Sequence, residues 1–357
     1  AMKMTYDFKT LSLSFTAGVA LGLFLNFPHP MIAASIAVSS AAILIALYSA
    51  HFASALLPHT ALLLLGFNSG LNVDIGPQLS LLTTCMLPQN ALSTLKSAID
   101  SLCLDGSETG ALATALLTGD KSLLNAQTIK EFRIAGASHI LALSGLHLGI
   151  ISSILRRLLF FIGNTIAGLH IRSVILIGAC LFYCLMTGAS PSVVRAFLFI
   201  TLAEIARLSP ERSTNRLNCY CLALMIQLII SPEAITTPGF QLSYLAMLGI
   251  YTIFPVLDAW LPAGKGTLHV KKLWSLAAMS ISCQLTTSPV AWILFHSFPV
   301  NFLLTNIITL PLCELFICSC IGCIALDSIG ICPEIAKSLT SMAGQALCYC
   351  IHVLTLI

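Results

Sequence analysis

The sequence contains very little charge. Only 9% of its 357 residues are Asp, Glu, Lys or Arg, whereas 57% are hydrophobic. A soluble domain of this length needs a charged surface to stay dispersed in water, so this composition excludes a soluble globular protein. The long apolar runs instead predict an all-α polytopic membrane protein.

Further absences limit the chemistry that the chain can perform. The GxxxxGK[ST] pattern of an ATP-binding loop is absent from the sequence, so any driving energy must come from elsewhere. The CxxC formed by Cys320 and Cys323 lies in an apolar run without a second pair, and we expect neither a metal nor a cofactor. Most cysteines lie in similar runs and act as small hydrophobic residues. Cys85 and Cys103 lie in the long polar segment, where they form a disulfide only if that segment faces an oxidising compartment.

The apolar runs predict about eleven membrane spans or re-entrant helices, since a span needs about 20 apolar residues. These runs lie at about 11–27, 31–50, 53–69, 139–162, 172–188, 190–207, 217–231, 237–257, 273–296, 301–325 and 335–357. The last run ends on the apolar Ile357 without a polar tail. We therefore expect a chain truncated from a longer protein, or a short relative of one.

A more polar segment, 70–138, separates the third predicted span from the fourth. It is expected to hold surface helices at 89–104 and 108–136, the second interrupted at Thr118–Lys121. Ile129, Phe132, Arg133 and Gly136 recur at helical spacing, which predicts an amphipathic helix lying on the bilayer. The predicted parts are N-terminal spans (1–69), an extracytoplasmic segment (70–138) and a membrane domain (139–357).

The basic residues test this topology. With the N-terminus in the cytoplasm and every span crossing, 12 of the 17 basic residues fall on the cytoplasmic side. They are Lys3, Lys9, Arg156, Arg157, Arg172, Arg207, Arg212, Arg216, Lys265, Lys271, Lys272 and Lys337. The positive-inside rule therefore predicts a cytoplasmic N-terminus and an extracytoplasmic C-terminus.

Three polar interruptions are candidates for a functional site, and the first begins the 139–162 run. It carries His139, Ser144 and His147, which are costly in a span without a partner or a purpose. Ser144 and His147 are adjacent in a helix. Gly145 and Gly149 permit close approach of another backbone. Two structural alternatives stay open: Ser144 bonds back to the carbonyl of residue 140, or His147 is a satisfied interhelical histidine.

The second interruption, Thr187–Arg195, joins two predicted spans. Ser190 before Pro191 is a good N-cap, with proline at the first helical position, and Gly188 precedes it. The free N–H groups and positive dipole end of such a helix suit an anion such as phosphate. Arg195 lies too deep to reach the interface cheaply, so we expect it to face protein or water; a structural role remains the alternative.

The third interruption, Thr236–Tyr244, starts another span. Pro238 and Gly239 predict a helix start, with Gln241 and Ser243 in its first turns. In the derived topology all three interruptions lie at the outer ends of their spans. They therefore predict one shared polar path, lined by His139, Ser144, His147, Ser190, Arg195, Gln241 and Ser243.

The motifs themselves resemble a known family. Four blocks carry this resemblance. In chain order they are Gly119-Asp120, Phe132-Arg-Ile-Ala-Gly-Ala-Ser-His-Ile-Leu-Ala-Leu-Ser-Gly-Leu-His147, Leu185-Met-Thr-Gly-Ala-Ser-Pro-Ser-Val-Val-Arg-Ala196 and Pro238-Gly-Phe-Gln-Leu-Ser243. These blocks are similar, in order and spacing, to the competence domain of the ComEC family. The resemblance implies a channel in the bacterial inner membrane that passes single-stranded DNA to the cytoplasm during natural transformation. Phe132 and Arg133 would guide the strand inward.

The departures from that family also carry information. Fuller members have an outer OB-fold domain, for which 70–105 is too short, and often a C-terminal metallo-β-lactamase-like nuclease, whose HxHxDH-type run is absent here. We therefore expect a non-enzymatic channel that works with a separate DNA receptor, a nuclease and a cytoplasmic ATPase. The sequence does not give its oligomeric state.

Two other functions remain as alternatives. An intramembrane serine hydrolase would use Ser144 as nucleophile and His147 as base, although no nearby acid orients the histidine. A small-solute transporter would bind its substrate at broken helices.

Overall fold

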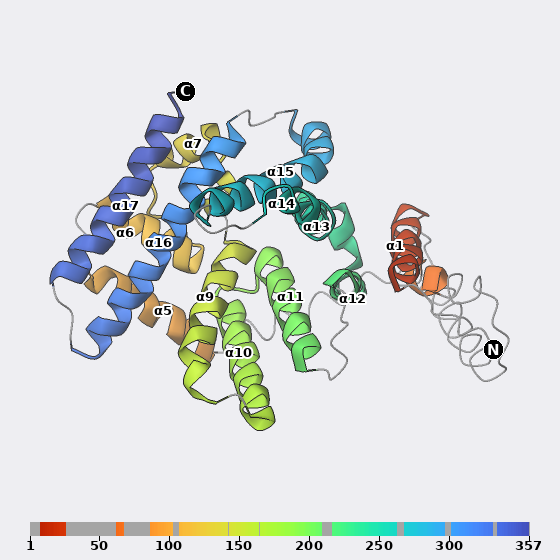
Figure 1. The fold of residues 1–357 in the computed structure, drawn as a ribbon, viewed down its shortest axis with the longest axis horizontal. Helices are drawn as coiled ribbons and strands as arrows, with labels where there is room; N and C mark the ends of the chain where they lie inside the picture. The colour runs from red at the N-terminus through yellow and green to blue at the C-terminus, as the bar shows by residue number, and fades with distance from the viewer. Residues whose placement is uncertain are drawn as a thin grey trace. The chain divides into compact units, whose positions relative to one another are not determined.

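The computed structural model describes residues 8–25, 62–67, 86–102, 107–141, 143–163, 165–208, 216–262, 268–296, 301–330 and 334–356. Every regular element in these ranges is a helix, which confirms the predicted all-α class for this part of the chain (Figure 1). Residues 62–67 are helical, and the labelled helices are α1 (Phe8–Leu25), α5 (Met86–Ser101), α6 (Ser107–Thr118), α7 (Ala126–Ile134), α8 (Ser138–Leu141), α9 (Gly145–Leu158), η1 (Leu159–Phe161), α10 (Ile166–Met186), α11 (Pro191–Leu208), α12 (Arg216–Ile230), η2 (Pro232–Thr236), α13 (Pro238–Thr252), α14 (Phe254–Ala259), α15 (Leu268–Phe295), α16 (Phe302–Ser328) and α17 (Glu334–Leu354).

Among the described residues, four helices are long and apolar enough to cross a membrane. They are Ile166–Met186, Pro238–Ala259, His269–Phe295 and Phe302–Ser328, and each coincides with a predicted span. Two further apolar helices, Leu11–Leu23 and Arg216–Ile230, are shorter. The predicted total of about eleven is not reached in this part of the chain; the run 31–50 and most of 53–69 lie outside it.

The chain divides into two compact units. The first comprises Ala1–Leu82 and Thr201–Tyr244, and the second comprises Thr83–Ile200 and Leu245–Ile357. This division does not follow the predicted boundaries after residues 69 and 138, because the chain leaves the second unit within α11 and returns to it within α13.

Close helix packing characterises the first unit, in which α1 contacts α12 and η2. Two glycines bring α1 against residues 62–67. A Cβ at Gly18 would lie 2.0 Å from the carbonyl oxygen of Leu63, and a Cβ at Gly66 would lie 2.0 Å from that of Phe15. Any larger side chain at either position would force these two helices apart.

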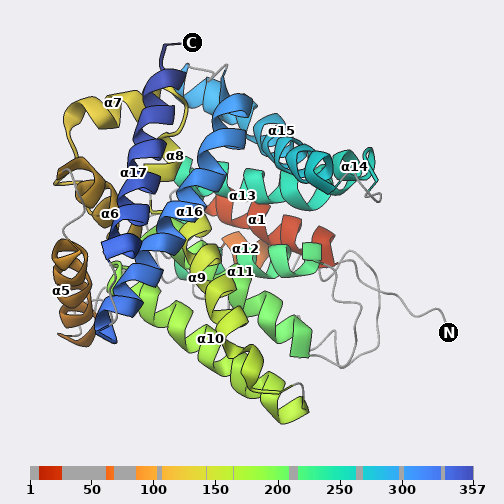
Figure 2. The same cartoon turned by 60° about the vertical axis from the view of Figure 1, so that its left-hand side comes forward.

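The second unit is built around α6, which contacts α5, α8, α16 and α17 (Figure 2). Residues 111–118 are all buried. Ala111 and Ala115 share one face of the helix and Ala113 lies on the opposite face, so small side chains let neighbouring helices approach from both sides. The prediction of a surface helix over 108–136 is therefore wrong for α6. The predicted break is confirmed, since α6 ends at Thr118 and α7 begins at Ala126.

Helix α7 also packs against this core. Phe132 is 0% exposed and belongs to the same hydrophobic cluster as α6, whereas Arg133 is exposed. Just beyond α7, the Thr305 hydroxyl of α16 donates to the carbonyl oxygen of Ala135 at 2.7 Å. The expectation that Phe132 guides DNA from a surface helix is therefore wrong. The helical spacing of apolar residues around Phe132 arises because this face of α7 packs against a protein core.

Candidate functional site

The stretch expected to form one span from residue 139 is divided into two helices. α8 ends at Leu141, and α9 begins at Gly145 with Ser144 as its N-cap residue. The Ser144 hydroxyl accepts a hydrogen bond from the Leu146 N–H at 3.2 Å, and the Ser144 N–H donates to His147 Nδ1 at 3.0 Å. This is a capping box with histidine in the position usually held by Glu or Gln. Ser144 thus starts a helix and does not sit inside one.

This geometry determines which nitrogen of neutral His147 carries the proton. Because Nδ1 accepts from the Ser144 N–H, the ring proton belongs on Nε2. Nε2 is buried and has no hydrogen-bond partner among the described residues, and the whole residue is only 1% exposed. A buried donor without an acceptor costs about 1–3 kcal/mol, so this position suits an incoming acceptor. His139 lies exposed on α8 and takes no part in the capping box.

The turn between α10 and α11 forms the second element of the site. Gly188 has φ 77° and Ala189 has φ 49°, and this left-handed conformation costs a non-glycine residue about 1–2 kcal/mol. The turn delivers Pro191 as the first residue of α11, as predicted. The Ser190 carbonyl oxygen accepts from the N–H groups of Val193 and Val194. Its hydroxyl oxygen is buried without a partner among the described residues, so the side chain does not form the expected cap.

Arg195 lies one turn into α11 and is only 2% exposed. Its Nη2 donates to the Ser192 hydroxyl at 3.1 Å. Arg195 is thus enclosed by protein, as expected for a charge too deep to reach the interface. Further along α11, Glu204 forms an ion pair with Arg207 at 3.0 Å.

A shared hydrophobic cluster joins the starts of α9 and α11. It contains Leu148 from α9, Tyr183 and Cys184 from α10, and Val193 from α11. A Cβ at Gly145 would lie only 3.1 Å from the Ala196 Cβ, so these helices meet there. Two positive helix ends, an arginine and two polar atoms that lack a partner in the described part of the chain therefore belong to one region.

Not every predicted residue joins this region. A Cβ at Gly149 would meet no described atom within 4 Å, so no packing role for Gly149 is seen. Pro238 begins α13 as predicted, followed by the exposed Gly239, and the Gln241 amide donates to the Ile235 carbonyl oxygen at 2.9 Å. Gln241 and Ser243 belong to the first compact unit, whereas the α9 and α11 starts belong to the second. The candidate site therefore comprises only the starts of α9 and α11.

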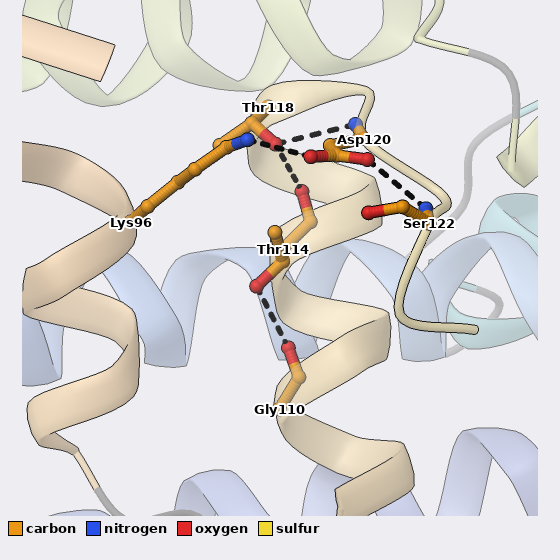
Figure 3. Close-up of polar contacts among 6 residues, drawn as sticks. All are labelled: Lys96, Gly110, Thr114, Thr118, Asp120 and Ser122. Carbon is orange, nitrogen blue, oxygen red and sulfur yellow. Dashed lines mark hydrogen bonds and ion pairs between the residues drawn. The ribbon is translucent and has the colours of Figure 1, made fainter. Parts of the chain in front are cut away.

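The C-terminal end of α6 carries a polar structure that the sequence indicated only through its predicted break. Gly119 has φ 83° and ends the helix, and the Thr118 hydroxyl donates to the Thr114 carbonyl oxygen at 2.7 Å (Figure 3). From α10, the Tyr183 hydroxyl donates to the Leu117 carbonyl oxygen at 2.9 Å. The end of α6 is thereby fixed to the helix that precedes the α11 turn.

Asp120 completes this structure. Its carboxylate forms an ion pair with Lys96 of α5 at 2.5 Å and accepts from the Ser122 N–H at 3.0 Å (Figure 3). The hydrogen bond from Lys96, followed by that from Ser122, holds the pKa of the Asp120 carboxyl well below its usual range. Asp120 thus ties the loop after α6 to α5.

Within the part of the chain that the structure describes, no group of three or more His, Cys, Asp or Glu side chains is placed to hold a metal ion. Cys85 and Cys103, which could form a disulfide in an oxidising compartment, lie outside that part.

Comparison with known proteins agrees with the motifs. The family model described as Competence protein matches residues 116–357. The chain is 27% identical over 201 residues to ComE operon protein 3 of Bacillus subtilis, covering 56% of this chain and 24% of that protein. It is 25% identical over 190 residues to the uncharacterized protein YcaI of Escherichia coli, covering 50% of this chain and 24% of that protein. The aligned region is thus about a quarter of either relative. No solved structure matches the chain.

Proposed function

Because the chain belongs to the competence protein family, we propose that it forms a membrane path through which single-stranded DNA enters the bacterial cytoplasm during natural transformation. One observation carries this proposal. The starts of α9 and α11 share a hydrophobic cluster, and beside it lie buried Arg195 and a buried imidazole whose Nε2–H has no partner among the described residues.

These groups match the chemistry of a sugar–phosphate backbone. Phosphate oxygens accept hydrogen bonds, and they are favoured at helix N-termini, where free N–H groups and the positive dipole end coincide. Arginine adds a charge-assisted hydrogen bond to phosphate, and this contact does not depend on the base sequence of the DNA. Ser190 supplies a hydroxyl that can donate or accept. Such a set suits successive phosphates of any sequence.

Several parts of the proposal concern the whole protein. We place the chain in the inner membrane, with a cytoplasmic N-terminus and an extracytoplasmic C-terminus. We assign it no reaction of its own. DNA capture, degradation of the second strand and ATP-driven pulling belong to a separate receptor, a nuclease and a cytoplasmic ATPase.

A serine hydrolase is the second candidate, because the Ser144 hydroxyl lies 3.2 Å from His147 Nδ1. Two features disfavour it. The Nδ1 lone pair already receives the Ser144 N–H, and no described carboxylate bonds to Nε2 to orient the ring. A fluorophosphonate probe tests it: labelling of wild type and not of Ser144→Ala would support hydrolysis, and no labelling would discard it.

Replacement of Arg195 tests the proposed function. Arg195→Ala should abolish entry of labelled DNA into the cytoplasm while binding of DNA to the cell surface continues. Arg195→Lys should retain part of the DNA uptake, because lysine keeps the positive charge but lacks the planar guanidinium group that forms bidentate hydrogen bonds. Lys337→Ala removes a positive charge on α17 and is the matched control.

All variants must be present in the membrane at wild-type amounts, measured by immunoblotting. Normal uptake by Arg195→Ala at that amount would remove Arg195 from the path and with it the main support for this site.

A further inference from the structure

The connection between α9 and α10 is a tightly built hairpin, distant in sequence from the capping residues of the proposed path. η1 follows α9 directly, and Thr165 caps α10 by accepting from the Gly168 N–H at 3.1 Å. A Cβ at Gly168 would lie 2.5 Å from the Ile162 carbonyl oxygen. The end of η1 therefore packs directly onto the first turn of α10, and the tip has a defined shape.

Large apolar side chains project from this tip. Phe161 is 89% exposed, Phe160 is 66% exposed and Leu158 is 63% exposed. The exposed apolar surface continues along α10 through Ile166 and Val174. Because α10 is one of the helices able to cross a membrane, the two phenylalanines lie where that apolar surface ends.

The same tip is strongly basic. Arg156 and Arg157 are exposed at the end of α9, and Arg172 of α10 donates from Nη2 to the Phe160 carbonyl oxygen at 2.5 Å. The sequence contains no Asp or Glu between Glu131 and Glu204, so every charged side chain of the hairpin itself is basic.

We propose that the α9–η1–α10 tip is a binding surface for anionic phospholipid. The guanidinium groups of Arg156, Arg157 and Arg172 contact the headgroup phosphate, and Phe160 and Phe161 insert among the acyl chains. The planar guanidinium group of arginine forms bidentate hydrogen bonds with phosphate. Exposed apolar residues beside basic ones are typical of surfaces that bind the membrane interface.

Nucleic acid is the other polyanion that such a surface could bind, and two observations favour lipid. The apolar residues at the tip continue into the outward surface of a candidate span, as expected at a bilayer boundary. The Arg172 guanidinium also lies 5.8 Å from the centre of the Phe160 ring, where it occupies a face that a stacked base would need.

The test uses the full chain purified in zwitterionic detergent and titrated with short-chain phosphatidylglycerol. The double variant Arg156→Gln/Arg157→Gln should bind this lipid roughly 30-fold more weakly than wild type, and each single variant about 5-fold more weakly. The variant Lys121→Gln/Lys130→Gln removes the same charge from exposed positions outside the tip and should bind like wild type. Short-chain phosphatidylcholine should not bind measurably at the tip in any variant.

A parallel titration with a fluorescent single-stranded oligonucleotide separates the two polyanions. The proposal expects equal oligonucleotide binding by wild type and the double variant. It is overturned if the double variant keeps wild-type affinity for phosphatidylglycerol, or if it loses oligonucleotide binding and keeps lipid binding. Should the double variant fail to fold, the two single variants decide by the same criteria.

Discussion

His147 allows the structural and transport roles of one residue to be separated. Its Nδ1 accepts the Ser144 N–H at 3.0 Å and so helps to start α9, whereas its buried Nε2 has no described partner. Glutamine at the same position can accept the Ser144 N–H, because Gln is a standard residue for the third position of a capping box. His147→Gln therefore preserves the helix start and removes the imidazole donor.

The magnitudes follow from these contacts. His147→Ala leaves the Ser144 N–H without its acceptor, at a cost of about 1–3 kcal/mol. It also empties the space of a side chain that is 1% exposed, so the free energy of unfolding should fall by about 2–4 kcal/mol in total. His147→Gln should stay within about 1.5 kcal/mol of wild type, because volume and acceptor are largely retained.

Two assays read these effects separately. Thermal unfolding of purified protein should rank wild type close to His147→Gln and both above His147→Ala. Uptake of labelled DNA into a nuclease-protected state should be strongly reduced in both variants. Wild-type uptake by His147→Gln would refute the inference that Nε2–H contacts the strand, and His147 would then be a capping residue only.

Two further predictions concern the packing around α6. Gly344→Ala should lower the free energy of unfolding by about 1–3 kcal/mol, because the new Cβ would lie 2.3 Å from Thr109 Cγ2 and 2.8 Å from Phe316 Cε2. The control is Gly322→Ala on α16, whose Cβ would meet nothing within 4 Å. Equal stability losses in the two variants would contradict the packing argument. For Asp120, a lowered folded-state pKa means that its stabilisation is complete above the unfolded value of about 3.9 and is lost as the pH falls toward the folded value. Wild type should therefore unfold at a higher temperature than Asp120→Asn at neutral pH, with a difference that shrinks in acid, and equal unfolding temperatures at neutral pH would show that the Lys96 ion pair stabilises nothing.

The sequence predicted the features that depend on local chemistry. Pro191 and Pro238 begin helices as expected, because proline is suited to the first helical position. The break after Thr118 was visible because Gly119 favours a left-handed backbone, which it adopts at φ 83°. The prediction that Ser144 and His147 lie side by side was also correct, since residues three apart approach each other at the start of a helix.

The features that depend on tertiary contacts could not be predicted in the same way. Phe132 has the spacing of an amphipathic surface helix, and periodicity does not reveal whether the apolar face meets lipid or protein. Helix α6 is likewise enclosed by α16 and α17, which begin only at Phe302 and Glu334. The left-handed Ala189 gave no signal at all, because alanine has no preference for that conformation.

Photocrosslinking at position 190 tests the central claim most directly. A photoreactive benzophenone amino acid replaces Ser190, and the same replacement at Phe182, which is 45% exposed on α10, is the control. Illumination of cells taking up labelled DNA should then crosslink single-stranded DNA to the protein modified at position 190 and not to that modified at 182. Unimpaired uptake without a crosslink at 190, or equal crosslinking at both positions, would contradict a DNA path at the starts of α9 and α11.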